Sequence, residues 1–394
     1  MFYPRDILPA LESHLANKQV TVLTGMRRTG KTTLLKHLME KSGIRQRAFF
    51  DLERIDYREL FSEKNYETIV HALNQRGLDL SEKTLIGIDE IQLAPNLPSV
   101  VKYLYDHYGI KFILTGSSSY YLKNRFEESL AGRKKIFEIY PLSLGEMLTF
   151  QGVAYSTMEE EFKPLPFIPS EYERLKPYYN DFIDFGGFPE VVLMKKKEDK
   201  RDMIADILSS YINNDVAVLT DFSKSEEVYQ LIKLLAIRVG ARMDISKICS
   251  VTGMSRRTVE NYLSLLEQSY LIQTIPVISK SPDREIVKAR KLYFLDNGIA
   301  SMSAELNSGS KFENAVFNQL RRFGDLAYYS LKTGNEIDFI LNKKMAIEVK
   351  ETATEAHLKN TINLARKIGV EQSYVIGRYP HQVFEGFVWG GVIR

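Results

Sequence analysis

Eight residues near the N-terminus have the types and spacing of a phosphate-binding loop. They follow the pattern G-x-x-x-x-G-K-T and are Gly25, Met26, Arg27, Arg28, Thr29, Gly30, Lys31 and Thr32, with Thr33 next in the chain. Glycines let backbone N–H groups approach a polyphosphate that larger side chains would block. The Lys31 ammonium is predicted to reach the β- and γ-phosphates, and the Thr32 hydroxyl to bind Mg²⁺. The pattern therefore predicts ATP and Mg²⁺ as ligands.

Two flanking elements must position this loop. Residues 18–23 are rich in β-branched side chains and predict a strand before the loop. Residues 33–39 have apolar side chains at helical spacing and predict a helix after it. The N-terminus of that helix adds its own attraction for anions. This context favours a phosphate site over a chance glycine-rich turn.

Two acids end a second predicted strand. Residues 85–88 are an apolar run, and Asp89 and Glu90 follow it. A buried parallel strand delivers such residues to its carboxyl end, where ligands of α/β sheets collect. Asp89 is predicted to hold the Mg²⁺, and Glu90 to polarise the water that attacks the γ-phosphate. A strand followed by an acidic helix cap is the alternative, and the P-loop upstream makes it the weaker one.

Two further positions extend the predicted nucleotide site. Thr115 or Ser117, at the end of the strand predicted at residues 112–115, is a candidate sensor of the γ-phosphate, and a simple turn stays open as the alternative. Arg133 is the candidate arginine finger, which in a homo-oligomer would reach the nucleotide of a neighbouring subunit. A surface arginine without such a role is the alternative there.

A carboxylate pair and a lysine recur near the C-terminus. Residues 335–350 predict a β-hairpin, and a hairpin symmetric about Lys343 places Asp338 opposite Glu348 with Cβ atoms roughly 5 Å apart. Lys350 shares the face of Glu348 because strand side chains alternate. A Mg²⁺ ion between the two carboxylates would activate water for phosphodiester cleavage, with Lys350 assisting as a catalytic residue.

This hairpin resembles the core of the PD-(D/E)xK nucleases. The resemblance implies Asp338 and Glu348 as metal ligands, Lys350 as the catalytic lysine, and Glu313 on a preceding helix as a further metal ligand. Glu313 also fits a capping box that begins at Ser310. A nuclease-like fold that binds DNA or regulates without cleaving is the second open interpretation.

The middle of the chain predicts a helix-turn-helix. Residues 244–249 predict a short helix, residues 252–254 a turn, and Ser255 an N-cap for a second helix over residues 256–269. Arg256, Arg257 and Asn261 are the candidate DNA-binding residues, since they fall on the outer face of that second helix. Residues 271–278 and the basic residues 288–291 then predict a wing. A packing unit between domains is the alternative role.

Several of these segments together resemble the AAA-type ATPases of bacteria and archaea whose C-terminal half has no characterised function. The resemblance rests on residues 25–32, 89–92, 115–118, 132–133, 140–146, 184–190 and 293–298. It covers nearly the whole chain and implies an ATPase without naming a substrate.

Composition sets outer limits on these hypotheses. The chain has 394 residues, of which 44% are hydrophobic and 26% charged, and this suits two or three soluble domains. A net charge of +3 neither requires nor excludes nucleic acid. A single cysteine excludes a disulfide framework and a cysteine metal cluster. Without a signal peptide or an apolar run of about 20 residues, a cytoplasmic protein with no membrane segment is expected.

The expected organisation is an α/β chain with four parts. Residues 1–148 predict an AAA-type P-loop ATPase domain with a mostly parallel sheet, whose strands fall at 20–23, 48–51, 85–89, 112–115 and 135–140. Residues 149–180 predict a linker or insertion, residues 181–284 a helical and winged-helix domain with helices at 201–218 and 226–239, and residues 285–394 a nuclease-like domain. The leading functional hypothesis is a Mg²⁺-dependent ATPase coupled to DNA binding and nuclease activity. The alternative is a nucleotide-switched signalling or scaffold ATPase whose C-terminal half binds protein partners.

Overall fold

The computed structural model describes residues 2–117, 130–156, 161–216, 225–279, 285, 289–331 and 333–394. The chain divides into two compact units, of which the first is Met1–Tyr140 with Gln268–Tyr270. The second is Pro141–Glu267 with Leu271–Arg394. The finer division into four parts stays a prediction. Among the described residues, no helix is long and apolar enough to cross a lipid bilayer.

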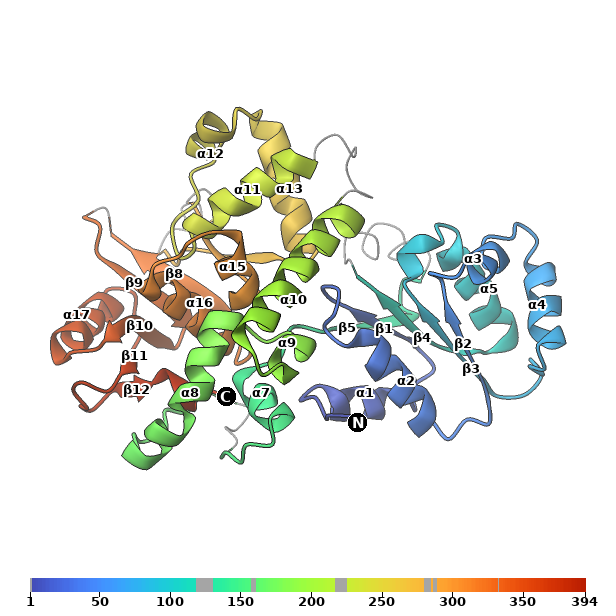
Figure 1. The fold of residues 1–394 in the computed structure, drawn as a ribbon, viewed down its shortest axis with the longest axis horizontal. Coiled ribbons are helices and arrows are strands. Elements are labelled where there is room, and N and C mark those ends of the chain that lie inside the picture. The colour runs from blue at the N-terminus through green and yellow to red at the C-terminus, as the bar shows by residue number, and fades with distance from the viewer. Residues whose placement is uncertain are drawn as a thin grey trace. The chain divides into compact units, whose positions relative to one another are not determined.

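A five-stranded sheet forms the centre of the first unit (Figure 1). Its strands are β1 (Val20–Thr24), β2 (Gln46–Asp51), β3 (Thr84–Asp89), β4 (Lys111–Gly116) and β5 (Lys134–Glu138). They lie in the order β2-β3-β4-β1-β5, and every neighbouring pair is parallel. All five predicted strands are present, so the parallel α/β prediction for this part is confirmed. The order places β4 between the P-loop strand β1 and the acid-bearing strand β3.

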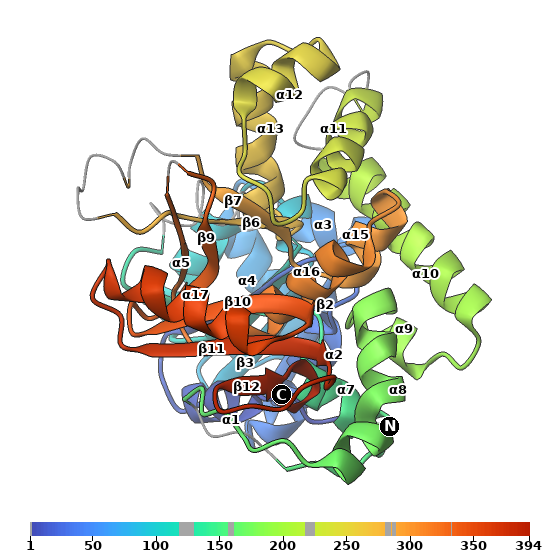
Figure 2. The same cartoon turned by 90° about the vertical axis from the view of Figure 1, so that its left-hand side faces the viewer.

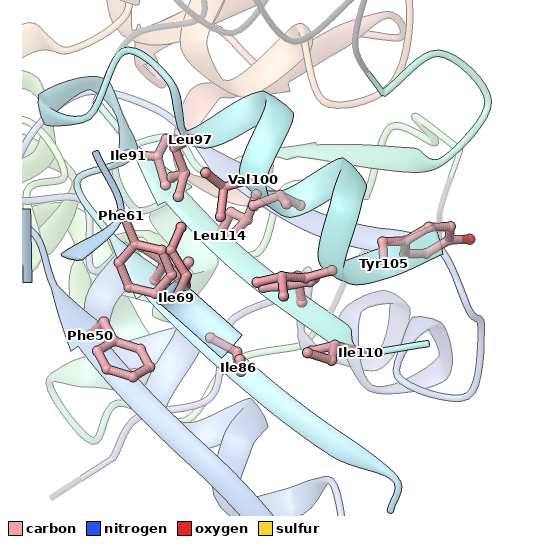
Figure 3. Packing of buried hydrophobic residues seen from close by; sticks show 14 of the residues in the cluster. Phe50, Phe61, Ile69, Ile86, Ile91, Leu97, Val100, Tyr105, Ile110 and Leu114 are labelled. Atoms are coloured by element: carbon pink, nitrogen blue, oxygen red, sulfur yellow. The ribbon is translucent and has the colours of Figure 1, made fainter. Parts of the chain in front are cut away.

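Helices cover both faces of this sheet. They are α1 (Leu8–His14), α2 (Lys31–Lys41), α3 (Ile55–Leu60), α4 (Tyr66–Gln75) and α5 (Leu97–Tyr108), with a 3₁₀ turn, η1, at Ile91–Leu93. Ile86 and Leu114 pack with Leu97 and Val100 of α5 in one core cluster (Figure 3). Their strand neighbours Leu85 and Ile113 pack in a second cluster with residues of α1 and α2. Because both faces of the sheet are buried, the strands are held in position. Their carboxyl ends, where the predicted site lies, are held with them.

The second unit is built around a mixed five-stranded sheet. Its strands are β8 (Leu326–Ser330), β9 (Glu336–Leu341), β10 (Met345–Thr352), β11 (Gln372–Tyr379) and β12 (Phe387–Trp389), in the order β12-β11-β10-β9-β8. β8, β9 and β10 pair antiparallel, whereas β10, β11 and β12 pair parallel. A parallel pair needs a crossover connection. Helix α17 (Glu355–Arg366) supplies it and lies over β10 and β11 (Figure 2).

The remaining elements also belong to the second unit, except for Gln268, the last residue of α13, which falls in the first. They are α7 (Leu144–Phe150), α8 (Pro169–Phe185), α9 (Pro189–Leu193), α10 (Lys197–Ser210), a π-helix at Tyr211–Val216, α11 (Ser225–Ile237), α12 (Ile245–Thr252), α13 (Arg256–Gln268), β6 (Ile272–Ile275), β7 (Lys291–Phe294), α15 (Asn297–Ser303), α16 (Ser308–Leu320) and a 3₁₀ turn at Gly390–Val392.

Two local predictions differ from these elements. The segment predicted as a linker contains most of α8, which begins at Pro169. Proline is tolerated in the first turn of a helix because its missing N–H has no intrahelical partner there, so Pro169 begins a helix where a break was expected. The helix predicted at 201–218 ends at Ser210 and continues as the π-helix to Val216, with residues 217 and 218 outside the described part of the chain.

Candidate nucleotide site and carboxylate cluster

The P-loop joins β1 to α2 through a backbone that needs its glycines. Gly25 has φ +152°, and a Cβ atom at this position would collide with the carbonyl oxygen of Ile139. Gly30 directly precedes α2. Its φ of +92° is also in the left-handed region that favours glycine. The loop thus presents backbone N–H groups and the N-terminus of α2 at the carboxyl end of β1, which is an arrangement suited to an anion.

Lys31 lies folded against this loop. Its Nζ donates hydrogen bonds to the carbonyl oxygens of Gly25 and Met26, each at 2.9 Å, and the residue is 5% exposed. The loop is closed further by Thr29, whose hydroxyl donates to Met26 O at 2.9 Å. The Arg5 guanidinium donates to Thr29 O at 3.0 Å. The two bonds of Lys31 hold its ammonium against the carbonyl oxygens of the loop.

Asp89 is held by two threonines from separate elements. Thr32 Oγ1 donates to Asp89 Oδ2 at 2.7 Å, and Thr115 Oγ1 donates to Asp89 Oδ1. Burial raises the pKa of the Asp89 carboxyl, and the hydrogen bonds from Thr115 and Thr32 act in the opposite direction. The Thr32 hydroxyl and the Asp89 carboxylate are oxygen ligands, which is the kind of ligand that Mg²⁺ prefers. Thr32 and Asp89 therefore fit the magnesium site predicted for them.

Glu90 is held in an unusual backbone conformation beside Asp89. Its φ is +55°, which is rare for a residue other than glycine and is found at functional sites. Its carboxylate accepts a hydrogen bond from Gln92 Nε2 and lies 3.9 Å from the Arg27 guanidinium of the P-loop. Gln92 Nε2 also donates to Ser117 Oγ at 3.0 Å. Gln92 thus links the predicted base to the predicted sensor, Ser117.

Gln92 and Thr115 were not assigned these contacts from the sequence. Thr115 was weighed only as a γ-phosphate sensor, and here it also accepts a hydrogen bond from the Glu90 N–H at 3.3 Å. Gln92 follows Glu90 by two residues and lies within η1, whose turn brings its side chain back to Glu90. The signal that points to Gln92 is therefore this short spacing after the acidic pair.

Arg133 lies at the other end of the sheet from the P-loop. Its carbonyl accepts a hydrogen bond from the Val20 N–H at 2.8 Å, at the start of β1, whereas the P-loop follows the end of that strand. Its guanidinium Nε donates to Asp106 Oδ1 at 2.9 Å. The structure does not bring Arg133 to the nucleotide site of its own chain, and its role in a neighbouring subunit stays a prediction.

The predicted helix-turn-helix is present as α12 and α13. Asp244 Oδ1 accepts a hydrogen bond from the Lys247 N–H at 3.1 Å and caps α12, and Gly253 ends this helix with φ +72°. Ser255 Oγ accepts from the Thr258 N–H at 3.1 Å and so caps α13. Four apolar residues at helical spacing along α13 are buried: Val259, Tyr262, Leu263 and Leu266. Sequence patterning and caps thus located both helices.

The candidate DNA-binding residues are exposed, but one basic residue of the predicted wing is buried. Arg256, Arg257 and Asn261 are exposed on α13, and Arg256 Nε donates to Glu260 Oε1 at 2.8 Å. β6 and β7 then form an antiparallel pair. Lys291, predicted as part of the basic wing, is only 1% exposed and lies at the start of β7. Lys288 lies outside the described residues.

The hairpin brings Asp338, Glu348 and Lys350 together. β9 and β10 pair Leu341 with Met345 and Phe339 with Ile347, which is the register symmetric about Lys343. Lys350 Nζ lies 2.7 Å from Glu348 Oε1 and 3.6 Å from Asp338 Oδ2. The two carboxylates are buried, with exposed fractions of 5% for Asp338 and 8% for Glu348.

A second lysine, which the sequence did not suggest, enters this cluster. Lys291 Nζ lies 3.0 Å from Glu336 Oε1, 3.3 Å from Asp338 Oδ1 and 3.7 Å from Glu313 Oε1. We call Lys291, Glu313, Glu336, Asp338, Glu348 and Lys350 the carboxylate cluster. No periodicity or motif links β7 to β9 and α16, so Lys291 and Glu336 are recognised only from the folded structure.

Glu313 has a different role from the capping box weighed for it. The N-cap of α16 is Asn307, whose Oδ1 accepts the Ser310 N–H at 2.8 Å, so Ser310 lies inside the first turn. The capping-box interpretation is therefore wrong. Glu313 Oε1 instead accepts a hydrogen bond from the Tyr293 hydroxyl at 2.8 Å.

Burial and like charge act together on the cluster. Burial, reinforced by the negative charge of Asp338, raises the pKa of Glu313 and of Glu348 to about 7. For Lys291, burial alone would lower the pKa, but Asp338, Glu313 and Glu336 outweigh it and raise the pKa above its ordinary value. The charged ammonium is thus the favoured form of Lys291.

The cluster does not fit a divalent metal as it stands. Asp338 Oδ2 accepts the Val349 N–H at 3.0 Å, and Asp338 Oδ1 lies against Lys291. Glu348 Oε1 is paired with Lys350, which leaves Glu348 Oε2 as a buried oxygen without a hydrogen-bond partner. Across the described ranges, no group of three or more His, Cys, Asp or Glu residues is arranged to hold a metal ion. The metal role predicted for Asp338, Glu348 and Glu313 has no support in this arrangement.

Comparison with family models divides the chain in three. Residues 17–148 match the AAA domain, residues 176–310 match a domain of unknown function (DUF8612), and residues 308–388 match another domain of unknown function (DUF4143). A Methanocaldococcus jannaschii protein described as uncharacterised is 29% identical, covering 89% of this chain and 79% of its own length. A Haemophilus influenzae protein, also described as uncharacterised, is 26% identical over 92% of this chain and 90% of its own length.

Solved structures give weak overall similarity. The Aeropyrum pernix ORC1 protein in complex with DNA has a TM-score of 0.32 and 15% identity, covering 75% of this chain and 90% of that chain. The Thermotoga maritima RuvB Holliday junction branch migration motor has a TM-score of 0.33 and 14% identity, covering 68% of this chain and 87% of that chain. Both scores are too low to support an argument about function.

The family match coincides with the P-loop, the parallel sheet and the buried acid at the end of β3. Its bounds, residues 17–148, include every strand of the first unit. The second half of the chain matches only domains whose function is unknown. Residues 17–148 therefore match the AAA domain and hold a P-loop on a parallel sheet, and residues 176–388 match two domains of unknown function.

Proposed function

We propose that the AAA-type domain binds ATP with Mg²⁺ and hydrolyses it. The observation that carries this proposal is the hydrogen bond of 2.7 Å between Thr32 Oγ1 and Asp89 Oδ2. It joins the hydroxyl of the P-loop to the acid of β3, although β4 lies between β1 and β3 in the sheet. Bound Mg²⁺ would neutralise charge on the phosphates, and these two side chains are the ones that would hold it.

The other residues of the site have roles that follow from their contacts. Lys31 would exchange the carbonyls of Gly25 and Met26 for phosphate oxygens, which are stronger acceptors because they are charged. Glu90 would orient the attacking water. Ser117 would contact the γ-phosphate, and its link through Gln92 would report that contact to Glu90.

Nucleotide binding tests the first part of this proposal. Calorimetric titration of the full chain with a non-hydrolysable ATP analogue and Mg²⁺ should give saturable binding. Lys31→Ala should weaken this binding about 10²-fold, since it removes a charged donor to the phosphates. Lys83→Ala is the matched control because Lys83 is an exposed lysine of the same unit. Equal binding by Lys31→Ala and the control would refute the proposed site.

For the second unit we infer DNA binding at the helix-turn-helix. The supporting observation is the exposure of Arg256 and Arg257 in the first turn of α13, after the tight turn at Gly253. The pairing of Arg256 with Glu260 reduces the positive charge of this surface but leaves Arg257 available to a phosphate.

Salt dependence separates this inference from protein binding. Affinity for duplex DNA should fall steeply with salt, and the slope of log K against log salt should shrink by about one for each arginine that contacts a phosphate. The test compares the double variant Arg256→Ala/Arg257→Ala with Arg201→Ala, an exposed arginine of α10. Absent binding, or a slope that both variants leave unchanged, would favour a C-terminal half that binds protein partners.

Cleavage is the part of the sequence-based hypothesis with least support. Lys291 lies against the oxygen of Asp338 that a metal would need. Of the two interpretations of the nuclease-like hairpin, we therefore infer the one in which the second unit binds without cleaving. Plasmid and single-stranded DNA should stay intact with Mg²⁺ or Mn²⁺, and cleavage that Asp338→Asn abolishes would contradict this.

A further inference from the structure

The carboxylate cluster contains a fully buried ammonium group. Lys291 is 1% exposed, and its Nζ lies within 3.7 Å of oxygens from Glu313, Glu336 and Asp338. Burying an isolated charge is expensive, and such a charge persists only where opposite charges surround it. Three carboxylates from α16 and β9 converge on this one ammonium, which comes from β7.

The ammonium occupies the position where a cation is needed. Carboxylates placed this close together repel one another unless a cation lies between them. In this structure Lys291 supplies that cation to Asp338 Oδ1. Lys350 supplies a second one at the rim, 2.7 Å from Glu348 Oε1, and Arg242 a third, 3.0 Å from Glu336 Oε2.

We propose that Lys291 is the resident cation of the carboxylate cluster and that it excludes a divalent metal ion from it. A Mg²⁺ or Mn²⁺ ion bound to Asp338 would lie about 2.1 Å from a carboxylate oxygen. Lys291 Nζ is 3.3 Å from Asp338 Oδ1, so the two cations would compete for the same oxygen and repel each other at short range.

The remaining oxygens show what the cluster lacks. Glu348 Oε2 is buried and has no hydrogen-bond partner, and Glu348 itself is 8% exposed. With Lys291 present, the oxygen of Asp338 nearest to it is already paired with a cation, and one buried oxygen of Glu348 alone is too few for a metal site. Without Lys291, oxygens of Asp338 and Glu313 would also be released. The cluster is therefore a set of carboxylates in which one lysine takes the place that a metal ion would need.

Binding of Mn²⁺ tests this proposal on the full chain without nucleotide. Free Mn²⁺ is followed by electron paramagnetic resonance during titration of the natural protein and of Lys291→Met, which keeps an unbranched side chain, one atom shorter, and removes its charge. The natural protein should have no Mn²⁺ site that Asp338→Asn abolishes. Lys291→Met should gain one such site, and Lys291→Met/Asp338→Asn should lose it again.

Two controls keep the test decisive. Lys344→Met removes an exposed lysine of the same hairpin and should gain no site. Lys291→Arg keeps the charge and should stay free of metal, so this comparison still applies if Lys291→Met does not fold. An Asp338-dependent Mn²⁺ site in the natural protein would overturn the proposal. So would a site gained by Lys291→Arg, or a folded Lys291→Met that gains none.

Discussion

The residue whose surroundings matter most in the nucleotide site is Asp89. Both of its carboxylate oxygens accept hydroxyl hydrogen bonds, from Thr32 and from Thr115. The first hydroxyl belongs to the P-loop, and the second comes from β4, the strand between β1 and β3. Thr115 therefore fixes the orientation of the carboxylate that would hold Mg²⁺.

Replacing Thr115 by valine should weaken Mg²⁺-dependent nucleotide binding. The change keeps the shape of the side chain and removes a hydrogen bond to a charged group, a loss of about 1.5–3 kcal/mol. That corresponds to about 10- to 150-fold in affinity, measured by titration with Mg²⁺ and an ATP analogue. Thr84→Val is the control, because Thr84 is a buried threonine at the other end of β3, where its hydroxyl donates to Glu82 O at 3.0 Å. An equal loss of affinity in both variants would show that Thr115 contributes only to general stability.

At the scale of elements, Asp296 joins three segments of the second unit. Its Oδ1 accepts the Ile299 N–H at 3.0 Å and caps α15, and its Oδ2 accepts the Gly187 N–H at 2.8 Å just after α8. The Gly187 carbonyl in turn accepts the Leu142 N–H at 2.6 Å. The segment that begins the second unit is thus tied to α8 and α15 through one buried carboxylate.

Asp296→Ala should destabilise the second unit strongly. It removes a helix cap, worth about 0.5–2 kcal/mol, and leaves a buried Gly187 N–H unpaired, at a further cost of about 1–3 kcal/mol. Asp244→Ala removes the exposed cap of α12 alone and should cost only about 1 kcal/mol. Urea unfolding of both variants measures the difference, and equal losses would show that Asp296 acts only as a cap.

The same residue predicts a pH dependence. Burial raises the pKa of Asp296 to about 6, although backbone N–H groups oppose the shift. The folded state then binds this proton more tightly than the unfolded state, so this contribution to stability is full below about pH 4 and is lost as the pH rises to about 6. Asp296→Asn does not titrate, so its unfolding free energy should fall less between pH 4.5 and 6.5 than that of the natural protein. An equal slope in both proteins would contradict the assignment.

Elements and caps were the features most accessible from sequence. β1 is rich in β-branched residues, and β3 and β4 contain apolar runs. Asp244 and Ser255 are short polar residues in front of amphipathic helices, so local patterning was enough to find these elements. The linker predicted around Pro169 was wrong because proline can either break a helix or begin one. Lys291 looked like an exposed basic residue, since nothing local shows that β7 passes beside β9 and α16. Contacts between distant segments, such as Lys291 with Asp338, depend on the tertiary fold.

At the scale of the whole molecule, the chain has two compact units, and the proposed nucleotide site lies entirely in the first. A ligand that binds only the folded state stabilises the unit that holds it, by about 2.7 kcal/mol at one hundred times its Kd. Calorimetry should therefore resolve two unfolding transitions. Mg²⁺ with an ATP analogue should raise the midpoint temperature of one of them. Asp296→Ala should lower the midpoint temperature of the other transition. A single transition that moves as a whole would show that the units unfold together.

Hydrolysis by Glu90→Gln tests the central claim most directly. Glu90 is proposed to act on the attacking water and not to bind the phosphates, so the variant should bind Mg²⁺ and the ATP analogue as the natural protein does. Its steady-state release of phosphate from ATP should fall by about 10² or more, whereas Glu59→Gln, an exposed glutamate of α3, should retain the natural rate. Undiminished phosphate release by Glu90→Gln would contradict the proposed ATPase mechanism.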